Sequence, residues 1–117
     1  MGVELRLLPV IQKNVWLSHE MWTVVGEYEF WKAIDSIPQQ PITEPIGCFL
    51  AQDKKTGETT YGNVETDPYG SRLKYTTVSD LLTLKDHKVA QDNWRNRAVW
   101  AALQQMPPEW IIVLYWH

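Results

Sequence analysis

Residues 110–116 read Trp-Ile-Ile-Val-Leu-Tyr-Trp, a run in which every side chain is apolar. In a β-strand, successive side chains point to opposite faces, so both faces of this strand must be covered by other parts of the chain. We therefore expect the run to form the central strand of a sheet. A strand at the end of a chain frays unless it is docked, which also favours a central position.

The stretch before this run predicts an amphipathic helix. We expect it to begin near Gln91 or Asp92 and to end before Pro107, where the pair Pro107-Pro108 stops it. At 100° per residue, the apolar side chains cover one broad arc of this helix. The arc consists of Trp94, Ala98, Val99, Ala101, Ala102, Leu103 and Met106.

Trp100 falls outside that arc and shares its side of the helix with Asn93, Asn96 and Arg97. An exposed indole next to a guanidinium and two amides can stack on a base or another planar ring and hydrogen-bond to its edge. These four residues are therefore the candidate partner- or ligand-binding residues. The alternative is that another segment, such as the proline-rich connector at 38–45, covers Trp100.

The first half of the chain carries two strand signals and one helix signal. Val3–Leu8 alternates apolar and charged side chains, as a half-buried strand does, and a second strand is expected at Thr23–Val25. Glu27–Asp35 predicts an amphipathic helix that ends at Pro38. Its apolar stripe contains Phe30, Trp31, Ile34 and Ile37, and its charge lies on Glu27, Glu29, Lys32 and Asp35.

The middle of the chain predicts antiparallel pairing. Cys48–Asp53 and Glu58–Asn63 flank a short loop with a glycine near its end, which is typical of a β-hairpin. Asp67-Pro68-Tyr69-Gly70 has the residues of a type I turn, with Asp first, Pro second and Gly fourth. A short strand follows at Ser71–Tyr75, with Leu73 and Tyr75 on one face.

A capping signal predicts one further helix. Thr77 with Asp80 three residues later resembles a capping box, so a helix should run from Val78 to Leu84. Strands and helices are mixed, and the hairpin signals favour antiparallel pairing over repeated βαβ units. We therefore expect one α+β domain over residues 1–117. Its single antiparallel sheet should hold the C-terminal strand at its centre, with about three helices packed mainly on one face.

The composition limits the classes of function. A net charge of -3 and a pI near 5.5 argue against a protein that binds duplex nucleic acid. The longest apolar run is far shorter than the roughly 20 residues that span a membrane. Glu4 and Arg6 interrupt the N-terminal segment, which removes a signal-peptide core. The single cysteine, Cys48, cannot form an internal disulfide, so we expect a cytoplasmic protein.

No sequence motif indicates a catalysed reaction. The chain lacks HxH, HExxH, CxxC, GxSxG, GxGxxG and GxxxxGK patterns, so we expect no catalytic residue, no cofactor and no metal site built from neighbouring ligands. A cluster that only the fold assembles from His19, His87, His117 or Cys48 stays open. The seven tryptophans either fill the core or place one or two rings at a binding site.

Short segments spread along the chain resemble a group of small proteins encoded by bacteriophages and prophages. These segments are Met1-Gly2-Val3-Glu4-Leu5, Tyr61-Gly62, Asp67-Pro68-Tyr69-Gly70 with Leu73 and Tyr75, and Leu114-Tyr115-Trp116-His117. The resemblance implies a phage accessory protein in the bacterial cytoplasm. Such proteins often bind a host enzyme or a defence system and modulate it, and the resemblance assigns no activity or binding residue.

Three hypotheses of function follow. The leading one is a non-enzymatic phage accessory protein that binds a host or phage macromolecule, with a protein as the partner. The second is a small-ligand or nucleotide-binding module in which Trp100, Arg97 and Trp94 hold a planar ring. The third is a small hydrolase whose His and carboxylate residues meet only in the fold. The oligomeric state stays open.

Overall fold

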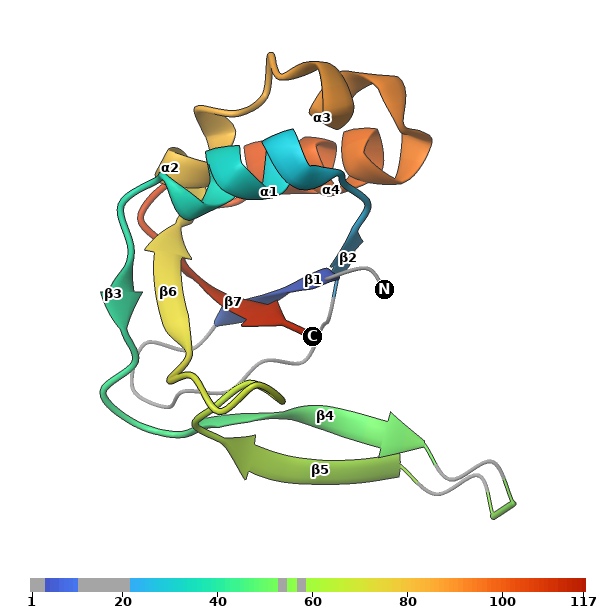
Figure 1. The fold of residues 1–117 in the computed structure, drawn as a ribbon, viewed down its shortest axis with the longest axis vertical. Helices are drawn as coiled ribbons and strands as arrows, with labels where there is room; N and C mark the ends of the chain where they lie inside the picture. Colours follow the sequence, from blue (N-terminus) through green and yellow to red (C-terminus); the bar gives the residue numbers. More distant parts are fainter. Residues whose placement is uncertain (1–3, 11–21, 53–54, 57–58) are drawn as a thin grey trace.

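The chain folds into three layers, with helices above a five-stranded sheet and a two-stranded sheet below it (Figure 1). The computed structural model describes residues 4–10, 22–52, 55–56 and 59–117, without the side chains of 48–52 and 59–61. The strands are β1 (Leu5–Val10), β2 (Trp22–Val24), β3 (Gln40–Pro41), β4 (Ile46–Gln52), β5 (Thr59–Val64), β6 (Lys74–Thr77) and β7 (Ile111–Trp116). The helices are α1 (Tyr28–Asp35), α2 (Val78–Leu82), α3 (Lys88–Asp92) and α4 (Trp94–Gln104).

The apolar run at the end of the chain forms the middle strand of the larger sheet, as predicted. The strand order is β2-β1-β7-β6-β3, and every pairing is antiparallel. Leu114 of β7 pairs with Leu7 of β1 on one side and with Lys74 of β6 on the other. The α+β class is therefore confirmed.

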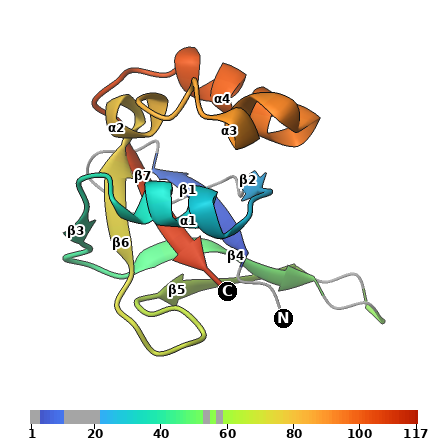
Figure 2. The same cartoon turned by 45° about the horizontal axis from the view of Figure 1, so that its top comes forward.

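Side chains of β7 alternate between two cores, because both faces of the sheet are covered. Ile112 and Leu114 join the helix-side core, while Val113 joins the core on the opposite face. The helix-side core contains residues of all four helices, so the expected packing of helices on one face is confirmed (Figure 2). The opposite core contains Leu8, Val10, Ile42, Ile46, Leu73 and Val113. Strand β1 is thus buried on both faces, and the expectation of a half-buried strand is wrong.

Local signals explain most of the boundaries. Thr77 Oγ1 accepts a hydrogen bond from the backbone N–H of Asp80 at 3.2 Å, which confirms the predicted cap of α2. Gly70 N–H donates to the Asp67 carbonyl at 3.0 Å, and Gly70 has a φ of 87°, so the turn there is confirmed. Strand β6 begins at Lys74, three residues later than expected, and Leu73 and Tyr75 both join the core on the face away from the helices.

The structure differs from the prediction in two places, the sheet that contains the hairpin and the helix before Pro107. The predicted hairpin forms, but β4 and β5 make a separate two-stranded sheet under the larger one instead of extending it. The helix expected from Gln91 or Asp92 is two helices, because Asn93 has an extended backbone and caps α4 by accepting the Arg95 N–H at 2.9 Å. An extended residue between α3 and α4 cannot continue either helix.

Candidate functional site

The expectation that Trp100 is exposed is wrong. Its side chain is only 4% exposed, and its indole Nε1–H donates a hydrogen bond to the Leu81 carbonyl at 3.1 Å. The ring also lies 5.7 Å from the Phe30 ring, measured between centroids. Helices α1 and α2 cover the indole, so the alternative that another segment covers Trp100 is confirmed, with these helices in place of the proline-rich connector. Trp100 is a core residue in this structure.

The other candidate residues hold backbone segments together. Asn96 is fully buried, donates from Nδ2 to the carbonyls of Val25 at 2.6 Å and Val89 at 3.0 Å, and accepts the Val25 N–H at 2.9 Å. Arg97 donates to two carbonyls at the end of α3, and Asn93 caps α4. Of the four, Asn93 lines a hollow, of about 360 Å³, between α3 and the connection from β2 to α1. The structure thus does not bring the four residues together on one surface.

The buried side of α4 is rotated from the predicted apolar arc. Its buried residues follow the spacing i, i+3, i+4, i+7, namely Asn96, Val99, Trp100 and Leu103. The predicted arc leaves out Asn96, whose amide is buried because long-range hydrogen bonds satisfy it. Trp94, which the arc included, is 66% exposed, and the Arg95 guanidinium lies 5.4 Å from its ring centroid.

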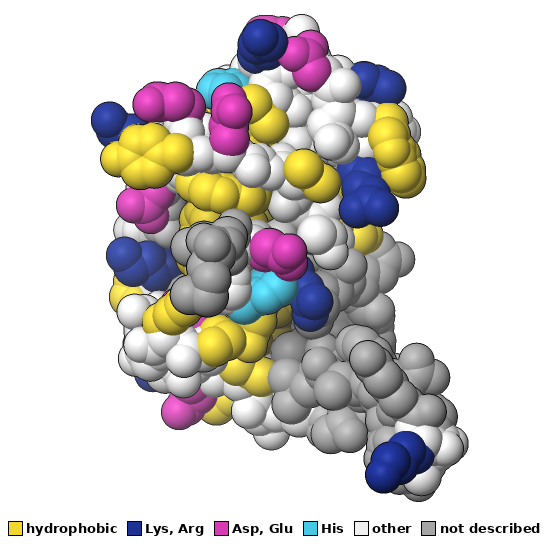
Figure 3. All heavy atoms as spheres, turned by 45° about the vertical axis from the view of Figure 1, so that its right-hand side comes forward, with side chains coloured by type: hydrophobic (Ala, Val, Ile, Leu, Met, Phe, Trp, Pro, Cys, Tyr) yellow, Lys and Arg dark blue, Asp and Glu magenta, His cyan; other side chains and the backbone are white. Residues whose placement is uncertain are grey.

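A group of exposed and partly exposed aromatic side chains lies on α1 and at the end of β7, apart from the exposed rings of Trp94 and Tyr69. Tyr28, Trp31, Lys32 and Asp35 follow the spacing i, i+3, i+4, i+7, so they share one side of α1 beside the stripe that faces the core. Together with Trp116, they line an open groove of about 430 Å³, which we call the aromatic groove. Tyr28 is 74% exposed. On the face shown in Figure 3, hydrophobic side chains lie next to acidic ones.

Packing fixes the positions of the two indoles in the aromatic groove. The rings of Trp31 and Trp116 meet edge to face, with centroids 5.5 Å apart and planes at 87°. Trp116 points toward the helices because it lies on the same face of β7 as Ile112 and Leu114. The Trp31 ring lies over Gly26, where an added Cβ would come within 2.7 Å of it. Residue 26 must therefore be glycine for Trp31 to keep this position.

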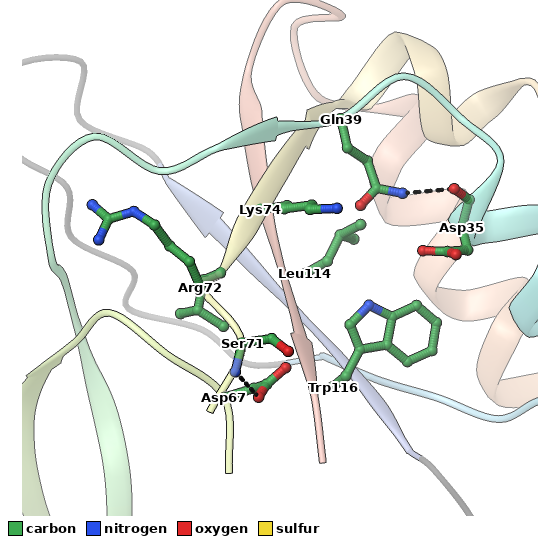
Figure 4. A pocket seen from close by; sticks show the side chains of 9 residues that line it. Asp35, Gln39, Asp67, Ser71, Arg72, Lys74, Leu114 and Trp116 are labelled. Atoms are coloured by element: carbon green, nitrogen blue, oxygen red, sulfur yellow. Dashed lines mark hydrogen bonds between the residues drawn. The ribbon is translucent and has the colours of Figure 1, made fainter. Parts of the chain in front are cut away.

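A smaller hollow, of about 200 Å³, adjoins the aromatic groove and shares Asp35 and Trp116 with it. Its polar side chains come from α1, the segment after it, the turn at 67–71 and β6 (Figure 4). Gln39 Nε2 donates to the Asp35 carbonyl at 3.2 Å, and Ser71 N–H donates to Asp67 Oδ1 at 3.0 Å. This polar hollow is lined by Asp35, Gln39, Asp67, Ser71, Arg72, Leu73, Lys74, Leu114 and Trp116.

His117 and Glu4 form a His–carboxylate pair at the end of the β1–β7 ladder. His117 Nε2 lies 3.7 Å from Glu4 Oε2. Burial lowers the pKa of His117 below its usual 6.5, Arg6 lowers it further, and Glu4 raises it. Neither His117 nor Glu4 lines the aromatic groove or the polar hollow.

The remaining residues that could carry chemistry have structural roles or lie outside the described part. His87 Nδ1 accepts the Val89 N–H at 3.2 Å, and its ring packs against Phe30 with centroids 4.9 Å apart. His19 and the side chain of Cys48 lie outside the described residues. Within the described residues, no group of three His, Cys, Asp or Glu side chains is arranged to hold a metal ion. No helix there is long and apolar enough to cross a membrane.

The sequence alone indicates the part of the aromatic groove that α1 contributes. Tyr28, Trp31, Lys32 and Asp35 recur at helical spacing in the sequence of α1. Trp31 packs against the helix-side core, as its place on the apolar stripe predicts, and also lines the groove. The contribution of Trp116 depends on the sheet register and could not be read locally. Searches against protein-family models, curated proteins and solved structures find no match for this chain.

Proposed function

We propose that this chain is a small non-enzymatic binding protein of phage origin, which engages a host or phage protein in the bacterial cytoplasm. The phage origin rests on the short segments that resemble phage and prophage proteins. The binding role rests on one observation, the aromatic groove between α1 and the end of β7. Its rings belong to Tyr28, Trp31 and Trp116.

The exposure of these rings supports a partner surface. Tyr28 presents most of its ring to solvent, next to two indoles that are only partly buried. Folding gains nothing from leaving a large ring in water, whereas Tyr and Trp are enriched among the residues that dominate binding energy at protein interfaces. An open groove also suits a protein segment better than a small molecule, because small-molecule sites enclose most of the ligand surface.

The second hypothesis, a nucleotide or other planar ligand, has less support. Trp100, which was expected to hold the ring, is buried and hydrogen-bonded within the protein, and Arg97 donates to two carbonyls at the end of α3. The polar hollow, at about 200 Å³, is smaller than the roughly 300–1,000 Å³ that is usual for ligand pockets. The hydrolase hypothesis would depend on His117 and Glu4, which lie outside both the aromatic groove and the polar hollow.

A matched pair of variants tests the proposal. Tyr28 and Trp94 are both large, exposed aromatic residues on helices, but only Tyr28 lines the aromatic groove. In affinity capture from a lysate of the bacterial host, Tyr28→Ala should reduce recovery of the partner by about 10-fold or more, as hot-spot residues do. Trp94→Ala should recover the partner like the unmodified chain. Quantitative mass spectrometry of the captured proteins gives both values.

Two outcomes would refute this proposal. Capture of the same proteins in the same amounts by Tyr28→Ala and the unmodified chain would remove the aromatic groove as the partner surface. Sedimentation that shows a dimer, together with a monomeric Tyr28→Ala variant, would mean that a second copy of the chain covers the groove. Circular dichroism of both variants confirms that neither result comes from unfolding, because exposed substitutions change stability little.

A further inference from the structure

The walls of the aromatic groove present the chemical features that attract a cation. The face of an aromatic ring carries a negative partial charge, and the face of Trp attracts cations best. Trp31 and Trp116 stand at 87° to one another, so their rings form a corner, with Tyr28 nearby in the same groove. A group placed in such a corner can contact more than one ring at once.

Asp35 adds a full negative charge to this corner. It lines both the aromatic groove and the polar hollow, and Figure 4 shows its carboxylate near the indole of Trp116. The cations Arg72 and Lys74 line the polar hollow with Asp35. Arg72 points away from Trp116 and donates from Nε to the Ile42 carbonyl at 2.8 Å, whereas Lys74 extends from β6 toward the side where Asp35 lies. The combination of ring faces and a carboxylate matches a guanidinium, which stacks on indoles and pairs with carboxylates through two parallel hydrogen bonds.

We infer that the aromatic groove binds an arginine side chain of the partner protein, an inference that rests on the proposed function. The guanidinium stacks in the corner of Trp31 and Trp116 and pairs with the Asp35 carboxylate. The chain contains an internal example of the stacking part, because the Arg95 guanidinium lies 5.4 Å from the Trp94 ring centroid. The net charge of -3 also favours approach of a basic partner segment.

Among the residues that the structure describes, Lys32 is the one cation that lines the aromatic groove, and it provides a test of the charge of the occupant. Its side chain is exposed and follows Tyr28 by one helical turn. Lysine side chains in such positions usually keep the ammonium group in water. A cationic occupant is repelled by Lys32 and attracted by Asp35. An anionic occupant would reverse both effects.

The experiment uses N-acetyl-arginine amide as the probe and follows the indole N–H signals by NMR. Trp31→Phe and Trp116→Phe assign the two signals of interest. N-acetyl-citrulline amide, which has the same shape without the charge, and N-acetyl-leucine amide are the controls. The arginine probe should shift both signals and bind about 5-fold or more tightly than the citrulline probe. Asp35→Asn should weaken binding of the arginine probe by about 3- to 10-fold, and Lys32→Gln should strengthen it.

Each contrary outcome has a defined meaning. Equal binding of citrulline or leucine amide overturns the inference and leaves the proposed function in place, because the aromatic groove then binds uncharged side chains. Stronger binding by Asp35→Asn with weaker binding by Lys32→Gln overturns it in favour of an anionic occupant. If no probe shifts the signals of Trp31 and Trp116, the inference fails, and the capture experiment with Tyr28→Ala decides the proposed function separately. Both charge variants lie at exposed positions, so thermal melting should confirm their fold.

Discussion

Replacing Trp100 with alanine should destabilise the protein strongly, although α4 carries polar residues around it. The indole is 4% exposed and packs against Phe30. Truncating a buried Trp to Ala costs about 3–5 kcal/mol, which combines lost apolar burial with the cavity that remains. The lost hydrogen bond to Leu81 adds about 1 kcal/mol at most, because the Leu81 carbonyl keeps its hydrogen bond from Leu84 N–H at 3.1 Å.

The matched control for this substitution is Trp94→Ala, on the first turn of the same helix. Trp94 is 66% exposed and contacts the Arg95 guanidinium, so its loss should cost less than about 1 kcal/mol. Trp100→Phe keeps an aromatic ring but loses the indole N–H, and should fall between the two. Since total stability is about 5–15 kcal/mol, Trp100→Ala removes a large part of it.

Urea denaturation followed by far-ultraviolet circular dichroism measures these differences without relying on the altered tryptophan fluorescence. The three variants should fall in the order Trp100→Ala, Trp100→Phe, Trp94→Ala, from least to most stable, with unchanged slopes. A Trp100→Ala variant as stable as Trp94→Ala would refute the placement of the indole in the core. It would also restore Trp100 as a candidate binding residue.

Three further outcomes follow from particular contacts. Asn96→Ala loses three hydrogen bonds to Val25 and Val89 and should lower the free energy of unfolding by about 3 kcal/mol in the same urea assay. Gly70→Val forces a β-branched residue to a φ of 87° and should cost about 1–2 kcal/mol, with a smaller cost for Gly70→Asn, which tolerates that conformation better. The pKa of His117 is lower in the folded chain than in the unfolded chain, so the unfolded chain binds the extra proton as pH falls below 6.5. The free energy of unfolding should therefore fall as the pH is lowered below 6.5. Urea denaturation midpoints measured across this range should depend less on pH for His117→Gln than for the unmodified chain. An equal dependence in both proteins would contradict the lowered pKa of His117.

The parts of the fold that were predicted correctly depend on local signals. The all-apolar run at 110–116 requires cover on both faces wherever it lies, and the hydrogen bond between Thr77 and Asp80 involves residues three apart in sequence. The turn at Asp67–Gly70 is equally local. Such features are determined by steric and hydrogen-bonding preferences that act within a few residues.

The parts that were missed depend on contacts between distant residues. Asn96 has a polar side chain but is buried, because its amide forms hydrogen bonds with the backbone of Val25, 71 residues earlier in the sequence. Once Asn96 is recognised as a buried position, the stripe it makes with Val99, Trp100 and Leu103 follows helical periodicity. The meeting of Trp31 with Trp116 likewise joins a helix near the start of the sequence to the end of β7. No pattern within either segment predicts the other.

The pairing of β1 with β7 has a consequence for how fast the protein folds. Leu5 pairs with Trp116, and the Glu4 and His117 backbones exchange hydrogen bonds at 2.8 Å, so the central ladder joins residues from opposite ends of the described chain. Closing so long a loop costs entropy before the ladder contributes any stability. A high contact order of this kind favours refolding in milliseconds to seconds instead of microseconds. During synthesis on the ribosome, β1 emerges before β7, so the central ladder cannot form until β7 has also emerged.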